Sequence, residues 1–272
     1  MSSYVIDKVS LKDPIVKVEI SDDKAITIFN VLALDYFSLN LKEGQEINRE
    51  QYENLKELHS YCFAYQKCLK KLGYKDLSEK EIDDLLNQQE NLNSNQKDKI
   101  IETLKELGLI NDEALVVNKI EIDQNKLIGK KKTKFELERR GLDKELVAQE
   151  IEKVSEADEI ERCKRKANLL YKGIKQKSFR EAIQGLRTKL STNGFEGYVI
   201  DAALNELDFQ MNQKEEKKNL EITIQKALKH YEKNLEGYKL KNKVYNYALA
   251  KGFNKDDITA ILNELEVDNN ED

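Results

Sequence analysis

The sequence predicts a mainly α-helical protein: an elongated, curved tandem array of three-helix, helix-turn-helix-like repeats that follows a small N-terminal β-hairpin region. Leu, Ile and Val recur at helical spacing from about residue 48 onward. A single proline in 272 residues leaves long stretches without a helix breaker. A pattern of glycine followed by an apolar residue recurs at separations longer than the roughly 34 residues of a two-helix repeat.

The first 47 residues are the β region. Residues 15–20 and 25–29 are rich in β-branched residues, and the polar segment 21–24 between them has the composition of a turn. We therefore expect a hairpin, with residues 4–9 as a candidate third strand. A hairpin alone is marginally stable, so residues 31–37 are expected to form a short helix that covers one face.

The repeat is defined by a glycine at the turn between two helices. A glycine there adopts the left-handed conformation that closes a helix, and the apolar residue after it can pack on a second one five residues later as a hydrophobic staple. Further apolar residues four and seven positions on complete a stripe that faces the core. The three copies are Gly141-Leu142 with Val147, Ile151 and Val154; Gly194-Phe195 with Ile200, Leu204 and Leu207; and Gly252-Phe253 with Ile258, Leu262 and Leu265.

The second helix of the repeat has a start signal in three copies. A Ser or Thr followed three residues later by Glu is a capping box, and it occurs as Ser78/Glu81, Thr133/Glu136 and Ser178/Glu181. A longer helix precedes each pair, near residues 55–72, 113–127, 156–172 and 213–235. The predicted division is 1–47 for the β region, 48–111, 112–155, 156–210 and 211–267 for four repeats, and 268–272 for an acidic tail.

The charge is unevenly distributed along the chain. The net charge is −5, yet residues 126–189 contain 19 Lys/Arg and 11 Asp/Glu, whereas residues 254–272 contain one Lys and seven acids. A basic face can attract a polyanion or an acidic protein groove, although solvation of charged helices explains the same pattern. The candidate partner- or DNA-binding face comprises Lys130, Lys131, Lys132, Lys134, Arg139, Arg140, Arg162, Lys164, Arg165, Lys166, Arg187 and Lys189.

Motifs for chemistry are weak. The segment Gly129–Thr133 lacks the first glycine of a phosphate-binding loop, and His59 with Cys62 is too small a cluster to predict a metal site. We therefore predict no enzyme activity, no cofactor and no metal. Three cysteines without regular spacing and a start without a leader or membrane span predict a cytoplasmic protein. Base stacking is a minor alternative to core packing for Tyr171, Tyr198, Tyr231, Tyr245 and Tyr247.

Three segments resemble the RecX family. Residues 178–195 resemble its Ser-x-Arg-x pattern followed by Leu-x-x-x-Gly-Phe, and residues 235–253 with the stripe Ile258, Leu262 and Leu265 resemble its last unit. Residues 72–112 resemble its first unit, and the β segment is similar to the extension of longer members. The resemblance implies a monomeric regulator that lies in the groove of RecA filaments on single-stranded DNA and inhibits ATP hydrolysis and strand exchange, with effects on DNA repair and the SOS response.

Two other functions stay open. The chain could be a helical module that binds single- or double-stranded DNA without sequence preference and without RecA, which salt-dependent binding to DNA alone would indicate. It could also be a scaffold for another helical protein. No membrane is expected as a partner under any of these hypotheses.

Overall fold

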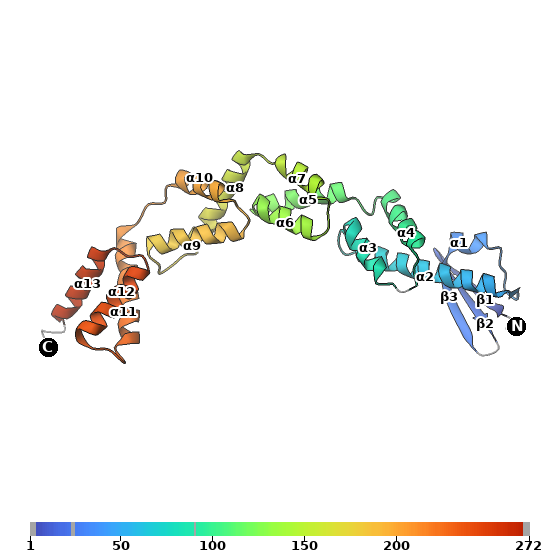
Figure 1. Cartoon of the computed structure of the whole chain (residues 1–272), viewed down its shortest axis with the longest axis horizontal. Helices are drawn as coiled ribbons and strands as arrows, with labels where there is room; N and C mark the ends of the chain where they lie inside the picture. Colours follow the sequence, from blue (N-terminus) through green and yellow to red (C-terminus); the bar gives the residue numbers. More distant parts are fainter. Residues whose placement is uncertain (1–3, 23–24, 90, 269–272) are drawn as a thin grey trace. The chain divides into compact units, whose positions relative to one another are not determined.

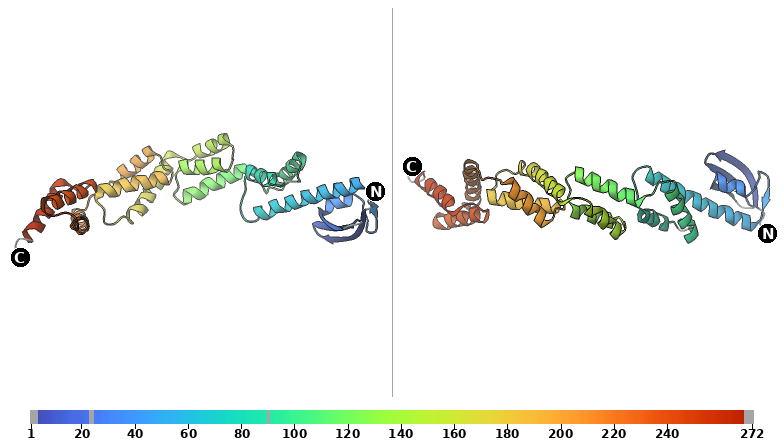
Figure 2. Two further views of the ribbon diagram at one scale, coloured as in Figure 1. Left: turned by 60° about the horizontal axis from the view of Figure 1, so that its bottom comes forward. Right: turned by 90° about the horizontal axis from the view of Figure 1, so that it is seen from above.

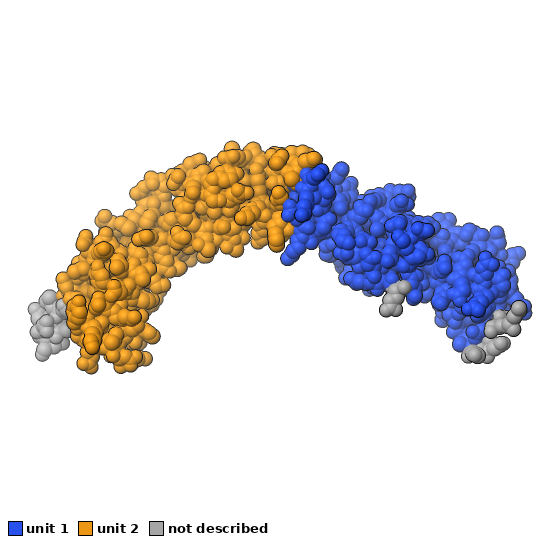
Figure 3. Space-filling view, in the orientation of Figure 1, with its two compact units in different colours: residues 1–118, 137–147 blue, residues 119–136, 148–272 orange. Residues whose placement is uncertain are grey.

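The computed structural model describes residues 4–22, 25–89 and 91–268, and these residues are mainly helical with an N-terminal antiparallel sheet, as predicted (Figure 1). The chain divides into two compact units (Figure 3). Unit 1 comprises residues 1–118 and 137–147, and unit 2 comprises residues 119–136 and 148–272. Residues 269–272 of the predicted acidic tail lie outside the described part.

The sheet of unit 1 has more strands than the predicted hairpin. Its strands are β1 (Tyr4–Lys12), β2 (Ile15–Ser21), β3 (Ile26–Leu32) and β4 (Glu46–Ile47), in the order β3-β2-β1-β4 and all antiparallel to their neighbours. The candidate third strand is therefore β1. The two residues of β4 were missed because so short a strand shows no alternation of polar and apolar residues.

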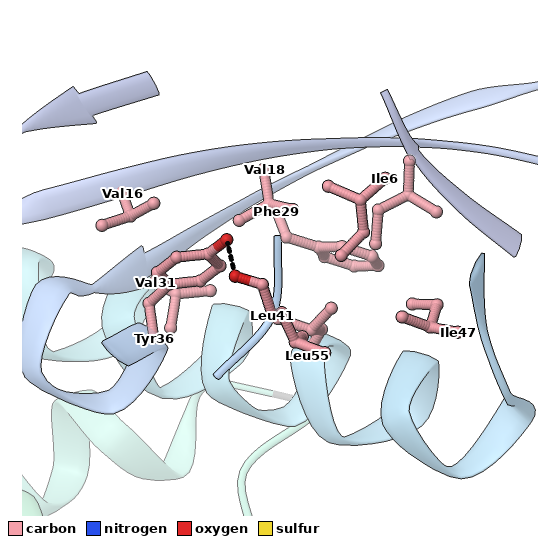
Figure 4. Close-up of a cluster of buried hydrophobic side chains, with 10 residues drawn as sticks. Ile6, Val16, Val18, Phe29, Val31, Tyr36, Leu41, Ile47 and Leu55 are labelled. Atoms are coloured by element: carbon pink, nitrogen blue, oxygen red, sulfur yellow. Dashed lines mark hydrogen bonds between the residues drawn. The ribbon is translucent and has the colours of Figure 1, made fainter. Parts of the chain in front are cut away.

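One face of the sheet carries the core of this region. Val18 of β2 lies directly opposite Val9 of β1 and Phe29 of β3. Directly paired residues point to the same side of a sheet, so these three side chains share one face. The short helix α1 (Ala33–Ser38) and the long helix α2 (Arg49–Leu72) cover that side (Figures 1 and 2). The Tyr36 hydroxyl donates a hydrogen bond of 3.0 Å to the Leu41 carbonyl within the core (Figure 4).

A second apolar cluster lies around the C-terminal half of α2. Helix α2 begins at Arg49, close to residue 48, where helical spacing was predicted to start, and Asn48 and Gln51 form a capping box there that we did not identify. Helices α3 (Glu79–Asn87) and α4 (Ser94–Glu106) follow, and the predicted capping box of Ser78 and Glu81 is present with both of its bonds. Their buried residues include Ile82, Leu86, Ile100 and Leu104, which form one cluster with Cys68.

The next helices are α5 (Asp112–Asn125), α6 (Lys130–Arg139) and α7 (Lys144–Glu152), and their residues are shared between the two units. The predicted capping box of Thr133 and Glu136 is wrong, because α6 already begins at Lys130. Thr133 lies inside the helix, and its buried hydroxyl donates to the Asp123 carboxylate at 2.9 Å. Asp123 also pairs with Lys119 at 2.7 Å, so polar groups occupy the interior here.

The rest of unit 2 contains two further sets of three helices. The first set is α8 (Glu156–Tyr171), α9 (Phe179–Thr192) and α10 (Gly197–Leu207), packed around Cys163, Leu186 and Phe195. The second set is α11 (Gln213–Tyr231), α12 (Gly237–Ala250) and α13 (Lys255–Asp268), packed around Ile224, Val244 and Phe253. We refer to α2–α4, α5–α7, α8–α10 and α11–α13 as triplets 1 to 4, a grouping that we propose.

The glycine turns are as predicted. Gly141, Gly194 and Gly252 have φ angles of 78°, 90° and 90°, the left-handed conformation. The apolar residue after each glycine is buried, and so are its staple partner and the residue four positions later. The side chain of Leu265, predicted to end the last stripe, lies outside the described part.

Consecutive triplets are joined in the same way at three places. An acidic residue in the first helix of one triplet accepts the first backbone N–H of the second helix of the preceding triplet. The pairs are Asp112 with the Glu79 amide at 2.9 Å, Glu159 with the Lys130 amide at 3.0 Å, and Glu216 with the Phe179 amide at 2.8 Å. Each acid accepts a backbone N–H that has no partner within its own helix. The carboxylate also lies at the N-terminal, positive end of that helix's dipole.

The turns take part in the same joints. The Ser78 hydroxyl donates to the carbonyl of Arg140, next to Gly141, and the Ser178 hydroxyl donates to the carbonyl of Lys251, next to Gly252. Gly129 takes the place of the serine in the middle joint, and its N–H donates to the carbonyl of Asn193, next to Gly194. No helix in the described part of the chain is both long and apolar enough to cross a membrane.

Candidate interaction surfaces

The predicted basic residues of unit 1 differ in exposure. Arg139 is exposed. The Arg140 guanidinium donates to the Glu81 carboxylate at 2.7 and 3.1 Å and to the Asp76 carbonyl at 2.8 Å. Burial raises the pKa of Glu81, but the hydrogen bonds from Arg140 and the Ser78 amide outweigh it, and the pKa lies below its ordinary value. Arg140 therefore holds a joint together.

Three predicted cations of unit 2 belong to the interior or to a joint. The Lys130 ammonium lies 2.5 Å from the Val154 carbonyl and 3.6 Å from Glu159. The backbone and Cβ of Lys132 lie against Gly194. Arg162 is only 9 % exposed, and its Nε has no hydrogen-bond partner among the described residues. Burial also lowers the pKa of Arg162. Lys130 and Arg162 are therefore not placed to meet a partner, whereas the joint takes up only the backbone and Cβ of Lys132.

Two more cations are neutralised by neighbouring carboxylates. Lys164 pairs with Glu161 at 2.7 Å and with Glu206 at 3.0 Å, and Arg187 pairs with Asp201. Lys166 is half-buried. The exposed members of the predicted face in unit 2 are Lys131, Lys134, Arg165 and Lys189.

The tyrosines named as candidates for stacking lie in different surroundings. Tyr171 is stacked on Phe209 with ring centres 4.3 Å apart, and Tyr245 packs against the core of triplet 4. Tyr198 is exposed, but burial and the nearby Glu156, Glu159 and Glu196 raise its pKa, so its surroundings are acidic. Tyr231 and Tyr247, by contrast, lie among lysines.

A basic and aromatic surface on triplet 4 was missed by the charge count over residues 126–189. Residues 226–251 contain seven Lys, two Glu and four Tyr. On α12, residues four apart lie on the same side of the helix, which places Lys239, Lys243 and Tyr247 in one row. The C-cap residue Lys251 continues the row and pairs with Glu181 at 3.6 Å. We call these four residues, with Tyr231 of α11, the Lys/Tyr surface.

The Lys/Tyr surface is held by contacts between rings and ammonium groups. The rings of Tyr231 and Tyr247 meet edge to face with centres 6.2 Å apart. The Lys243 ammonium lies 5.5 Å from the centre of the Tyr231 ring, and the Lys251 ammonium lies 5.8 Å from that of Tyr247. Such contacts place positive charge over the ring faces.

The described residues offer little for catalysis or metal binding. They contain no group of three or more His, Cys, Asp or Glu side chains that could hold a metal ion. The Nδ1 atom of His59 accepts the Asn30 N–H at 2.9 Å, so this histidine is used at the edge of the sheet. The surfaces just described are suited to binding.

Comparison with known proteins points to one family. A family model described as the third three-helix domain of RecX matches residues 215–262. Regulatory protein RecX of Clostridioides difficile (strain 630) is 28% identical over 205 residues, which are 74% of this chain and 93% of that protein. Regulatory protein RecX of Lactococcus lactis subsp. lactis (strain IL1403) is 28% identical over 91% of this chain and 89% of its own length.

The fold agrees with this relationship. A crystal structure of regulatory protein RecX matches with a TM-score of 0.58 and 19% identity over 74% of this chain and 99% of that chain. The domain match and the relatives together support the RecX family for this chain. The segment matched by the third RecX domain begins in α11 and ends in α13, so the Lys/Tyr surface lies within it. The RecX relatives are named as regulatory proteins and not as enzymes.

Proposed function

We propose that this RecX-family chain is a regulatory protein that binds RecA, or RecA filaments on single-stranded DNA, and inhibits their ATP hydrolysis and strand exchange. The supporting observation is the match to proteins named regulatory protein RecX, which extends over 91% of the chain in one case. The resemblance of residues 178–195 and 235–253 to RecX implies the same role.

The physical character of the chain supports a binding function. Helical triplets that contact mainly their neighbours expose long side-chain surfaces, which suit a partner with a repeating structure. The proposed regulator acts in the cytoplasm as a monomer without a cofactor. Through inhibition of RecA it would modulate DNA repair, homologous recombination and the SOS response.

The part of the predicted basic face that stays exposed is the proposed contact. Lys131, Arg165 and Lys189 are exposed, whereas Lys130, Arg140, Arg162, Lys164 and Arg187 are engaged or buried within the protein. We propose that the exposed cations meet the polyanionic filament, whose DNA phosphates attract them at long range.

The test is RecA's ATP hydrolysis on single-stranded DNA with increasing amounts of this protein. Dose-dependent loss at or below one protein per RecA supports the proposal. Unchanged hydrolysis and unchanged strand exchange at stoichiometric protein would rule it out.

The exposed face is tested by charge reversal. We expect the triple substitution Lys131→Glu, Arg165→Glu, Lys189→Glu to weaken inhibition about tenfold or more, because three attractive contacts become repulsive. The matched control reverses Lys42, Lys70 and Lys144, which are exposed and outside the predicted face. Equal loss in both triple variants would show that only net charge matters.

A further inference from the structure

Arg162 of α8 is a buried charge without a partner. The residue is 9 % exposed, and its Nε is closed to solvent and has no hydrogen-bond partner among the described residues. No ion pair between described residues includes its guanidinium, and Asp158 and Glu159 act on it only through longer-range attraction. A buried charge without a counter-ion strongly destabilises a fold, so a ligand for this arginine is expected.

A small cavity adjoins the Arg162 side chain. Arg162, Lys130, Gln124 and Thr133 line it together with four aliphatic side chains, and its volume is about 10 Å³. All of these residues belong to unit 2. A cavity of this size holds a ligand of a single heavy atom, and its aliphatic walls form no hydrogen bonds. Such a ligand is therefore held by the polar side chains.

The acids near the cavity are already paired. Glu159 is 1 % exposed, and its carboxylate accepts the Lys130 backbone N–H at 3.0 Å and lies 3.6 Å from the Lys130 ammonium. Asp123 is 1 % exposed and accepts the Lys119 ammonium at 2.7 and 2.8 Å. Glu136 shares that lysine, but 29 % of its side chain is exposed, so solvent screens its charge. Each buried carboxylate thus has its own lysine, and the guanidinium is the cation left over.

The chemistry of the cavity selects a small anion. A cation would be repelled by Arg162 and by Lys130, whose ammonium donates one of its three N–H groups to the Val154 carbonyl at 2.5 Å. A phosphate or a carboxylate has several heavy atoms and exceeds the volume. A water molecule fits but brings no charge. A halide ion supplies the charge and has a single atom.

We propose that the cavity at the middle joint binds a chloride ion, with the Arg162 Nε–H and the Lys130 ammonium as its donors. The ion supplies the counter-charge that the guanidinium lacks. Lys130 begins α6 of triplet 2 and Arg162 lies in α8 of triplet 3, so bound chloride stabilises the contact between these two triplets. The inference goes beyond the proposed function, because it involves no RecA and no nucleic acid.

The first experiment measures thermal unfolding of the full chain by circular dichroism while sodium chloride replaces sodium acetate at constant ionic strength. Acetate is too large for the cavity, and constant ionic strength keeps the screening of surface charges fixed. We expect the midpoint to rise by about 2–4 °C and then to level off, because a ligand that binds only the folded state stabilises it by mass action.

The second experiment assigns the effect to the buried guanidinium. We expect Arg162→Met to unfold at the same midpoint in chloride and in acetate, because the charge that holds the ion is gone. An apolar side chain in place of a buried charge is often neutral or stabilising, so this variant should fold. The matched control is Arg165→Met, an exposed arginine of the same helix, which we expect to keep the full chloride shift.

The third experiment detects the ion itself and does not depend on stability. We expect the native chain to broaden the chlorine NMR signal of sodium chloride, Arg165→Met to broaden it equally, and Arg162→Met to lose the excess broadening. Equal broadening by both variants, or a midpoint that does not distinguish chloride from acetate, would overturn the inference and leave water as the occupant. Neither readout involves RecA, so failure of this inference and failure of the proposed function are distinguishable.

Discussion

The two glycines of the middle joint face each other through their backbones. A Cβ added to Gly194 would lie 2.3 Å from the Lys132 Cβ and 2.6 Å from the Lys132 nitrogen, and one added to Gly129 would lie 2.3 Å from the Gly194 carbonyl carbon. Gly194 also has a φ of 90°. Helix α6 and the turn between α9 and α10 can approach so closely only because both residues lack a side chain.

This close contact predicts that a single methyl group added at Gly194 greatly lowers the free energy of unfolding. We expect Gly194→Ala to lower the free energy of unfolding by about 2–4 kcal/mol, because the added Cβ meets backbone and the φ angle is unfavourable for alanine. Gly185→Ala is the control within α9. Its added Cβ would meet nothing within 4 Å, and we expect a gain of up to about 1 kcal/mol from higher helix propensity. Urea unfolding followed by circular dichroism measures both, and equal effects would contradict the assignment.

At the scale of the helix, the joints combine a cap with a contact between triplets. The Ser178 hydroxyl accepts the Glu181 N–H at 3.0 Å and donates to the Lys251 carbonyl at 2.6 Å. Ser155 caps α8 by accepting the Asp158 N–H at 3.1 Å, and it is exposed. Ser178 thus caps a helix of one triplet and also contacts the next triplet, whereas Ser155 only caps a helix.

Replacing each serine with alanine should lower the free energy of unfolding by different amounts. We expect Ser178→Ala to lower the free energy of unfolding by about 2–3 kcal/mol, since it loses a cap and leaves the partly buried Lys251 carbonyl without its donor. We expect Ser155→Ala to cost about 1 kcal/mol, the usual value for a cap alone. Chemical denaturation of both variants checks this, and a cost for Ser178→Ala no larger than that for Ser155→Ala would argue against the double role.

The acid of the last joint makes stability depend on pH. Burial raises the pKa of Glu216 above its ordinary value of 4.5, the Phe179 N–H opposes the rise, and Asp257 and Glu215 add to it. The folded state therefore holds this proton more tightly than the unfolded state. Stability is lost as the pH rises from the ordinary value through the raised one.

We expect Glu216→Gln to remove this loss, because glutamine keeps an oxygen for the Phe179 N–H and carries no charge. The variant should gain stability relative to the unmodified protein as the pH rises from acid to neutral, with no gain below the ordinary pKa. Unfolding measured at several pH values, with Glu121→Gln as an exposed control, tests the sign. A gain that grows towards acid pH would be the wrong sign.

At the scale of the whole molecule, the two units contain separate cysteines. Cys62 and Cys68 lie in unit 1 and Cys163 lies in unit 2, and all three are buried. Burial raises the pKa of the Cys62 and Cys68 thiols to about 11 each and that of Cys163 to about 12. A thiol reagent needs the thiolate, so it can react only after the unit opens.

These thiols should report the opening of each unit. We expect native protein at neutral pH to react slowly and unfolded protein to react at all three thiols. A Cys163→Ala variant should report unit 1 alone, and a Cys62→Ala, Cys68→Ala variant should report unit 2 alone. Mass spectrometry over a urea series measures the two midpoints. Rapid labelling of the native protein would contradict the buried environments.

The sequence by itself determined the helices and the turns between them. The turn signals span only a few residues each, so they can be recognised from the sequence without knowledge of the fold. They are Gly141, Gly194 and Gly252 with their staple partners. One local signal gave a wrong prediction. Thr133 has the spacing of a helix cap but lies inside α6, where its hydroxyl donates a hydrogen bond to the Asp123 carboxylate. The Lys- and Tyr-rich composition of residues 226–251 also indicates the Lys/Tyr surface, but our charge count covered residues 126–189 and did not include this segment.

Only the tertiary structure decided which basic residues are available to a partner. Lys130 and Arg162 look alike in sequence to Lys131 and Arg165, yet the first two lie in a joint or in the interior and the last two face solvent. The acids that cap the joints, such as Asp112 for Glu79 and Glu216 for Phe179, lie 33 and 37 residues from the amides they bind. Burial and such pairings depend on how helices pack, and no short stretch of sequence encodes packing between distant segments.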